Sequence, residues 1–322
     1  MEEPGSGFTI AAVQAAPVFL NRAATTEKAC ELIAEAARNG ARFIVFPEAF
    51  IPTYPDWVWA VPPGQGDLLG SLYARLLDQA VTIPDETTDA LCAAARAAGA
   101  YVVMGINERN REASGGSLYC ALLYIGPDGQ ILGRHRKLVP TAAERLVWAQ
   151  GDGSTLDVFD TPYGRLGGLI CWENYMPLAR YAMYARGVQI YVAATWDRGE
   201  PWISTLRHIA KEGRAYVVGC CIAMRKGDLP EELRGGPYYA EAGEWINAGD
   251  STIVDPEGTI LAGPAHKTQE IIYAEVDPRR MRGPQWMLDV AGHYARPDVF
   301  ELIVHTEPRP VLTLRERPAA GE

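Results

Sequence analysis

The sequence lacks the features that define several classes of protein. It contains no run of about 18 uninterrupted apolar residues, so no transmembrane helix is predicted and no membrane partner is expected. Its 40 acidic and 30 basic residues give a net charge of −10, which argues against general affinity for nucleic acid, because phosphate binding needs a basic surface. The first residues, MEEPGSG, are acidic and contain no apolar segment, so we expect no secretory signal.

The cysteines and histidines also lack the spacing of redox or metal sites. None of the six cysteines forms a Cys-x-x-Cys pair, and the five histidines are scattered along the chain. We therefore expect no disulfide framework and no bound metal, and a cytoplasmic location. Five of the cysteines are interpreted as small buried residues, namely Cys30, Cys92, Cys120, Cys220 and Cys221.

The sequence does contain enough apolar residues for a large core. A chain of 322 residues, 48% hydrophobic and 22% charged, can form one large α/β domain, with two domains as the weaker alternative. No linker rich in Gly, Ser or Pro divides it. We expect a single domain over 1–322, with a core at about 8–300 and a C-terminal tail at 301–322 that is either disordered or docked on another subunit.

Strand and helix patterns alternate along this domain. Strands are predicted at 8–14, 42–46, 101–106, 117–125, 130–137, 166–170, 188–194, 216–223, 251–254, 259–262 and 270–276, and helices at about 26–39, 68–81, 85–98 and 175–186. The turns GPDG at 126–129 and DPEG at 255–258 indicate antiparallel hairpins among parallel strand–helix units. This combination favours one mixed sheet, or two mixed sheets with helices outside, over a doubly wound fold.

Cys171 has surroundings unlike those of the other cysteines. The apolar stretch at 166–170 ends at this thiol, and a polar Trp-Glu-Asn precedes the next helix pattern. A cysteine at such a junction lies at the carboxyl end of a strand, where α/β sheets bind their ligands. Backbone N–H groups there can lower the pKa of a thiol and stabilise a developing negative charge. The pattern predicts a cysteine nucleophile.

Three charged residues can supply a base and an electrophilic helper for this thiol. Glu48 follows the apolar strand RFIVF, where partial burial can make a carboxylate a general base; a solvated loop glutamate is the alternative. Lys137 ends the stretch QILGRHRK and can stabilise an anionic intermediate, unless it is a surface charge. Glu144 lies on a predicted helical turn or is a surface charge. Because Glu48, Lys137 and Cys171 all follow strands, we expect one mixed sheet to bring them to one edge.

Longer motifs around these residues resemble those of the nitrilase superfamily of carbon–nitrogen hydrolases and, in detail, its nitrilase branch. The motifs are FPEAFIP at 46–52 with Tyr54 and Pro55, HRKLVPT at 135–141 with Glu144 and Arg145, GDGS at 151–154, and CWENYMPLAR at 171–180. The resemblance covers nearly the whole chain. It implies a nitrilase-like αββα sandwich of two mixed sheets with helices outside, and homo-oligomers built from dimers that are often extended into spirals.

The same resemblance implies hydrolysis of an organic nitrile to a carboxylic acid and ammonia, without a metal or an organic cofactor. Cys171 would attack the nitrile carbon to form a thioimidate and then a thioester, while Glu48 takes the thiol proton. Lys137 and the backbone N–H of Trp172 would stabilise the tetrahedral centres, and Glu144 would position Lys137 or the attacking water.

An apolar pocket for the nitrile is predicted beside the thiol. Tyr54, Trp172 and Trp196 could line it, although Trp196 fits a core aromatic equally well. Thr53 stands where many relatives have glycine, so the pocket wall near Tyr54 is expected to differ. The alternative functions are an amidase or N-carbamoyl hydrolase of the same superfamily, a cyanide-degrading variant, and a catalytically silent assembly protein on the same fold.

Three polar neighbours of the expected site have other interpretations. Asn174 is interpreted as a helix cap, because it precedes a helix pattern. Glu173 either orients the loop or faces the substrate. His135 is interpreted as a packing or hydrogen-bonding residue rather than a catalyst, since Glu48 already supplies the base.

Overall fold

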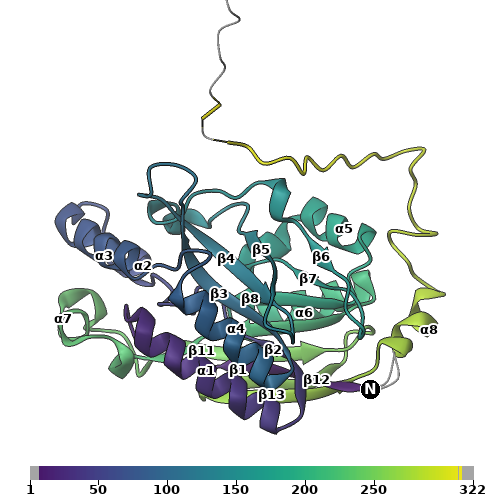
Figure 1. Ribbon diagram of the computed structural model, residues 1–322, viewed down its shortest axis with the longest axis horizontal. Coiled ribbons are helices and arrows are strands. Elements are labelled where there is room, and N and C mark those ends of the chain that lie inside the picture. Colours follow the sequence, from purple (N-terminus) through teal and green to yellow (C-terminus); the bar gives the residue numbers. More distant parts are fainter. Residues whose placement is uncertain (1–6, 311, 314–322) are drawn as a thin grey trace, which may run out of the picture.

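Two β-sheets face each other, with helices on their outer sides, in the computed structural model of the protein (Figure 1). The structure describes residues 7–310, 312 and 313. The expectations for the segment 1–6 and for residues 311 and 314–322 of the tail lie outside the described residues. The architecture confirms the predicted αββα sandwich of two mixed sheets. No helix in the described part of the chain is long and apolar enough to cross a membrane.

The first sheet contains six strands in the order β13-β1-β2-β3-β4-β5. β1, β2 and β3 run parallel, and the other pairs are antiparallel. The strands are β1 (Phe8–Gln14), β2 (Ala41–Val45), β3 (Tyr101–Arg109), β4 (Leu118–Ile125), β5 (Ile131–Arg136) and β13 (Glu270–Val276).

The second sheet contains seven strands in the order β10-β11-β9-β8-β7-β6, with β12 paired to β11. Its parallel centre consists of β7, β8 and β9, and β8 and β9 are buried along their whole length, as parallel strands covered on both faces must be. The strands are β6 (Val158–Phe159), β7 (Leu166–Gly168), β8 (Ile190–Thr195), β9 (Tyr216–Cys221), β10 (Ala223–Arg225), β11 (Trp245–Val254) and β12 (Ile260–His266).

The helices divide between the two outer faces. α1 and α4 pack against each other on the first sheet, whereas α5 and α6 cover the second. The helices are α1 (Arg22–Arg38), α2 (Trp57–Ala60), α3 (Gly66–Asp78), α4 (Glu86–Ala98), α5 (Pro177–Ala185), α6 (Glu200–Gly213), α7 (Glu231–Arg234) and α8 (Arg282–Gln285).

Strand β8 shows how the two cores are separated. Ile190, Val192 and Ala194 belong to the core that includes the space between the sheets. Tyr191 and Ala193 point the other way and pack in the core beneath α5 and α6. Side chains alternate along a strand, so a fully apolar strand can serve both layers at once.

The structure differs from the predicted elements at several places, among them β11, which begins at Trp245 although the strand was predicted only at 251–254. Helix α1 begins at Arg22, four residues before the predicted start, because the Asn21 side chain accepts a hydrogen bond from the Ala24 N–H at 3.0 Å and caps the helix there. Helix α6 was not predicted, although Ile203, Leu206 and Ile209 have helical spacing and are buried. The predicted strands at 8–14 and 270–276 are confirmed with the same bounds.

Candidate active site

The predicted site residues come from both sheets. Glu48 follows β2 and Lys137 follows β5 of the first sheet, whereas Cys171 follows β7 of the second. The expectation that one sheet edge gathers all three is therefore wrong. They meet because the two sheets face each other, so that strand ends from opposite layers converge.

The Lys137 ammonium lies between two carboxylates. Its Nζ is 2.6 Å from Oε1 of Glu48 and 2.7 Å from Oε2 of Glu144. All three side chains are buried. The alternative interpretations, a solvated loop glutamate for Glu48 and surface charges for Lys137 and Glu144, are therefore wrong. Although burial alone lowers the pKa of Lys137, the negative charges of Glu48 and Glu144 raise it well above its usual value. Lys137 is therefore a permanent cation here.

Glu144 is held by its own turn and by Tyr54. It lies on a short 3-10 turn (Ala142–Leu146), and its Oε2 accepts the backbone N–H of Thr141 at 2.7 Å. The Tyr54 hydroxyl donates to Oε1 of Glu144 at 2.7 Å. With Lys137 on the same carboxylate, Glu144 has donors on both oxygens, which fixes its orientation.

The surroundings of Glu48 raise the pKa of its carboxyl group toward neutrality. Burial raises its pKa to about 7; Lys137 lowers it, Glu144 raises it, and a hydrogen bond from the Cys171 thiol lowers it. Its Oε2 accepts the backbone N–H of Trp196 at 2.9 Å. A carboxyl that titrates near neutrality can both accept and return a proton at physiological pH.

A glycine in β3 allows the Glu48 segment to lie where it does. A Cβ at Gly105 would collide with the carbonyl of Pro47 and the N–H of Ala49. The Ile51 N–H donates to the Gly105 carbonyl at 3.1 Å, so the two backbones are in direct contact on both sides of Glu48. Any side chain at position 105 would push this carboxylate out of place.

Cys171 lies in a left-handed backbone conformation, with φ +51°, and is only 4% exposed. Such a conformation is uncommon for a residue with a side chain and persists where the surroundings impose it. Burial and the nearby Glu48 raise the pKa of the thiol, so it is protonated at rest. The Thr195 hydroxyl, at the end of β8, donates to its Sγ at 3.3 Å.

Asn174 and Glu173 hold the Cys171 turn rather than cap a helix. The Asn174 amide donates to the Cys171 carbonyl at 2.8 Å and accepts from the Tyr191 hydroxyl at 2.8 Å. Helix α5 begins at Pro177, after an N-cap at Met176, so the interpretation of Asn174 as a helix cap is wrong. The Glu173 carboxylate bonds to backbone N–H groups and to His135, so it orients the loop; His135 is a hydrogen-bonding residue, as predicted.

The three aromatic residues predicted for the pocket occupy different environments. Tyr54 is buried and stacks on Trp196, with ring centroids 4.3 Å apart. Trp172 is 51% exposed, and its indole N–H donates to Asp197 at 2.8 Å. Thr53 is buried beside Tyr54, where its carbonyl accepts the Asn107 side chain at 2.9 Å. Tyr54 and Trp196 thus form one wall next to the charged cluster.

Two contacts of the cluster were missed from the sequence. The Cys120 thiol lies 3.5 Å from Oε1 of Glu48, and its residue had been interpreted only as a small buried one. Thr195 could have been found, because it directly follows the apolar strand predicted at 188–194, as Cys171 follows the strand predicted at 166–170. Nothing in the sequence around Cys120 marks it.

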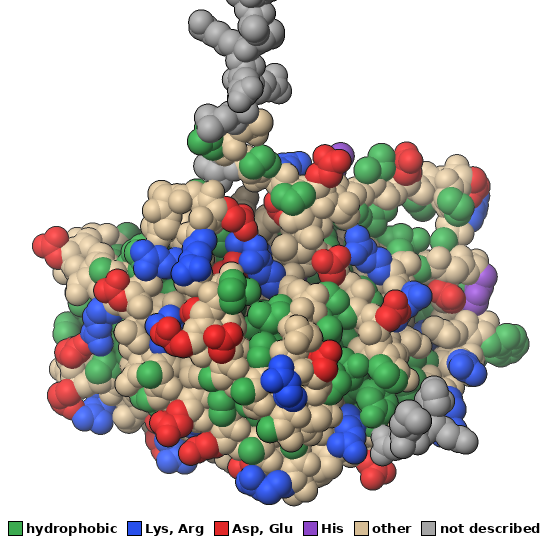
Figure 2. Space-filling model, viewed as in Figure 1, with side chains coloured by type: hydrophobic (Ala, Val, Ile, Leu, Met, Phe, Trp, Pro, Cys, Tyr) green, Lys and Arg blue, Asp and Glu red, His purple; other side chains and the backbone are tan. Residues whose placement is uncertain are grey.

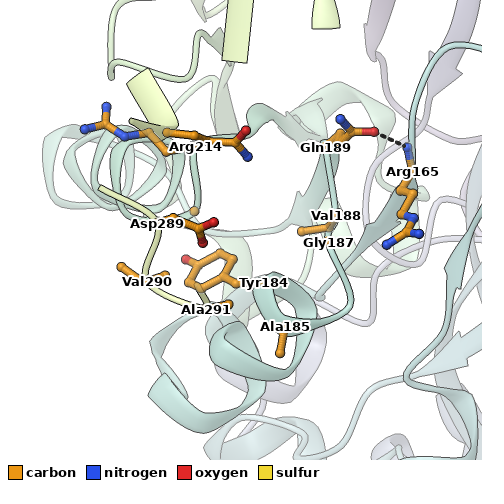
Figure 3. Close-up of a pocket in the computed structure, with 12 residues that line it drawn as sticks. Arg165, Tyr184, Ala185, Gly187, Val188, Gln189, Arg214, Asp289, Val290 and Ala291 are labelled. Carbon is orange, nitrogen blue, oxygen red and sulfur yellow. Dashed lines mark hydrogen bonds between the residues drawn. The ribbon is translucent and has the colours of Figure 1, made fainter. Parts of the chain in front are cut away.

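Two surface cavities lie away from this cluster. One of about 480 Å³ is lined by Arg165, Tyr184 and Asp289 among other residues, and Figure 3 shows the Tyr184 and Asp289 side chains beside each other there. A groove of about 940 Å³ runs between α5 and the C-terminal segment around His305. Neither is lined by Glu48, Lys137 or Cys171. Among the described residues, no group of three or more His, Cys, Asp or Glu side chains could hold a metal ion.

Comparisons with known proteins show which family the chain belongs to. An aliphatic nitrilase of Sinorhizobium fredii (strain HH103) is 44% identical over 96% of this chain and 99% of its own length. A bifunctional nitrilase/nitrile hydratase of Lupinus angustifolius is 42% identical over 92% of this chain and 85% of its own. Nit3 of Saccharomyces cerevisiae, a member of the nitrilase superfamily, shares the fold with a TM-score of 0.71 and 21% identity over 91% of this chain and 98% of its own.

The family model for carbon–nitrogen hydrolases matches residues 9–283, which is most of the chain. Sequence relatives, fold and family model agree over the same region. The chain belongs to the carbon–nitrogen hydrolase family.

Proposed function

We propose that the protein is a nitrilase that hydrolyses an organic nitrile to the carboxylic acid and ammonia. The observation that carries the proposal is the buried cluster in which the Lys137 ammonium contacts Glu48 and Glu144 next to the Cys171 thiol. It occurs in a chain that is 44% identical to an aliphatic nitrilase, which is why we favour nitriles over amides.

The first step uses the thiol and Glu48. The Cys171 sulfur attacks the nitrile carbon, its proton passes to Glu48, and Glu48 returns that proton to the nitrile nitrogen to give a thioimidate. The thiol is protonated at rest, so it needs a base, and a carboxyl with a pKa near 7 suits both transfers. Lys137 donates to the anionic centre, an interaction worth roughly 2.7–4 kcal/mol per donor.

The second step consumes water. Water adds to the thioimidate carbon, and the tetrahedral centre expels ammonia to leave a thioester on Cys171. A second water then releases the carboxylic acid and restores the thiol. If the same centre expels the thiol before ammonia, the product is the amide, so acid and amide are alternative outcomes of one intermediate. Glu144, fixed by Tyr54, holds Lys137 or the attacking water through these steps.

We propose that Tyr54, Trp196 and Trp172 bind the organic part of the nitrile. Tyr54 and Trp196 offer a stacked apolar wall beside Glu48, which suits the hydrocarbon part of an aliphatic or aromatic nitrile. Trp172, next to Cys171 but half-exposed, would contact the outer part of the substrate. Its backbone N–H remains our second proposed donor to the tetrahedral centre.

A panel of substrates tests the function. We expect ammonia and acid from butyronitrile, benzonitrile, phenylacetonitrile or a dinitrile, with Cys171→Ala lowering turnover by at least about 10³-fold. The control is Cys92→Ala, a half-buried thiol on α4, which should keep full activity and shows that thiol loss alone is harmless. Acid, amide and ammonia are quantified for each nitrile, for cyanide and for the matching amides.

The outcomes of this panel separate the alternatives. Ammonia from amides with none from nitriles would identify an amidase and overturn the proposal. Turnover of cyanide alone would identify the cyanide-degrading variant. No turnover of any compound would favour the silent assembly protein, and full activity of Cys171→Ala would overturn the choice of nucleophile.

The raised pKa of Glu48 predicts the pH dependence. Because Glu48 must be deprotonated to act as the base, and because kcat/KM reports the ionisation of groups in the free enzyme, kcat/KM should fall as the pH drops below the pKa of Glu48, about 7. Glu144→Gln removes a negative charge that raises this pKa, so the acid limb should move to lower pH. Glu108→Gln, a buried carboxylate paired with Arg136, should leave the limb in place. A limb that stays or moves upward in Glu144→Gln would contradict the role of Glu48.

We also propose that the chains form homo-oligomers built from dimers, of which a spiral is one form. We propose a cytoplasmic location, because a nucleophilic thiol stays reduced there. Leu178 on α5 is 67% exposed, and Trp286 and Phe300, in the segment that follows α8, are 81% and 78% exposed. Figure 1 shows this segment running from α8 past α5. Figure 2, in the same orientation as Figure 1, shows apolar side chains on the surface among acidic and basic ones. Exposed apolar surface of this kind favours association.

Light scattering on the purified protein tests the assembly. We expect a mass of at least a dimer, and Leu178→Lys should shift it toward the 35.2 kDa monomer, because a charge in an apolar contact is costly to bury. The matched change Leu146→Lys, at a residue that is 54% exposed but not on α5, should leave the mass unchanged. A monomeric wild-type protein would overturn the proposal.

A further inference from the structure

The Glu173 carboxylate joins the two loops that carry Lys137 and Cys171. Its Oε1 accepts the backbone N–H of Leu138, the residue after Lys137, at 2.6 Å. Its Oε2 accepts the backbone N–H of Ile170, the residue before Cys171, at 2.7 Å. Lys137 follows the first sheet and Cys171 the second, so a single buried side chain spans the gap between the two sheets at the site.

His135 completes the environment of this carboxylate. Its Nδ1 lies 3.1 Å from the Thr155 carbonyl, and its Nε2 lies 3.0 Å from Oε2 of Glu173. Both ring nitrogens face acceptors, so the arrangement is satisfied when the ring carries a proton on each nitrogen and is positively charged. The buried charge of Glu173 then has a buried partner, without which it would be strongly unfavourable.

We propose that Glu173, paired with His135, is a positioning residue that sets the distance and orientation between the Lys137 ammonium and the Cys171 thiol. This inference rests on the proposed function, in which Lys137 stabilises the centre formed on Cys171. The side chains of Glu173 and His135 make no hydrogen bond to Glu48, Lys137 or Cys171 among the described residues. Glu173 acts through the backbone N–H groups of Leu138 and Ile170, and His135 acts through Glu173.

The substitution Glu173→Gln removes one of the two loop contacts whichever way the amide is turned. Each carboxylate oxygen accepts a different backbone N–H, so the NH₂ group of glutamine must face either Leu138 or Ile170, where it meets another donor. The change keeps the size of the side chain but removes one acceptor and the negative charge that faces His135. One loop is therefore released while the packing stays the same.

Glu108 provides a matched control, because its partner Arg136 is the residue next to His135 on β5. Glu108 is also a buried carboxylate, and it pairs with Arg136, the residue between His135 and Lys137. Because side chains alternate along β5, Arg136 and Glu108 face away from the Glu173 pair. Glu108→Gln thus repeats the loss of a buried charge without touching the backbone of either loop.

The experiment measures kcat and KM for a nitrile, together with the rate at which iodoacetamide alkylates Cys171, read by mass spectrometry of its peptide. For Glu173→Gln we expect kcat to fall by roughly 10²-fold with little change in KM, since a small misplacement of reacting groups has an effect of this order. Alkylation should slow by about tenfold for the same reason. Glu108→Gln should leave kcat and alkylation at the wild-type values, even if its melting temperature falls.

His135→Gln provides a second variant if Glu173→Gln does not fold. It keeps an amide donor for the carboxylate but removes the positive charge, so kcat and alkylation should fall in the same direction by a smaller factor. Folded variants of Glu173 or His135 with wild-type kcat and alkylation would overturn the inference. If the wild-type protein turns over no nitrile, the proposed function fails, and the alkylation rates still decide whether Glu173 positions the thiol.

Discussion

The ammonium group of Lys137 lies between two carboxylates where solvent does not reach, and the surrounding structure depends on that contact. Its distances to Glu48 and Glu144 are 2.6 and 2.7 Å, and all three side chains are fully buried or nearly so. Breaking such a pair by removing one partner leaves an uncompensated charge, at a cost of about 3–5 kcal/mol. Separating any of the three groups from the others would therefore destabilise the folded protein. Their combination also gives Glu48 a pKa near neutrality and keeps a cation beside a protonated thiol.

The backbone is shaped to deliver these groups to one place. Gly105 lets β3 contact the segment on either side of Glu48, and the left-handed turn at Cys171 presents the thiol from the opposite sheet. Asn174 and Glu173 hold that turn by hydrogen bonds to its backbone. The reactive side chains are thus fixed by buried, satisfied polar contacts on two rigid sheets, which is the condition under which electrostatic stabilisation of a transition state is effective.

Glu48, Lys137 and Cys171 could be singled out in the sequence because each follows an apolar strand, and the structure places them in one buried cluster. The sequence was not sufficient for their spatial relation. Nothing local distinguishes a strand of one sheet from a strand of the other, so Cys171 was assigned to the same sheet edge as Glu48. Asn174 was wrongly interpreted for a similar reason. A polar residue before a helix pattern is typical of an N-cap, whereas the hydrogen bond from Tyr191 to Asn174 depends on β8 lying beside the turn in the folded chain. The contact of Cys120 with Glu48 likewise depends on tertiary packing alone.

The central claim is that Cys171 carries the substrate carbon during turnover. The direct measurement is mass spectrometry of the cysteine-containing peptides after acid quenching at successive times in a reaction with excess protein over nitrile. We predict that the peptide with Cys171 transiently gains the mass of the imidoyl or acyl group and loses it as acid appears. Complete turnover with Cys171 unmodified at every time, or with the group on Cys120 instead, would contradict the account.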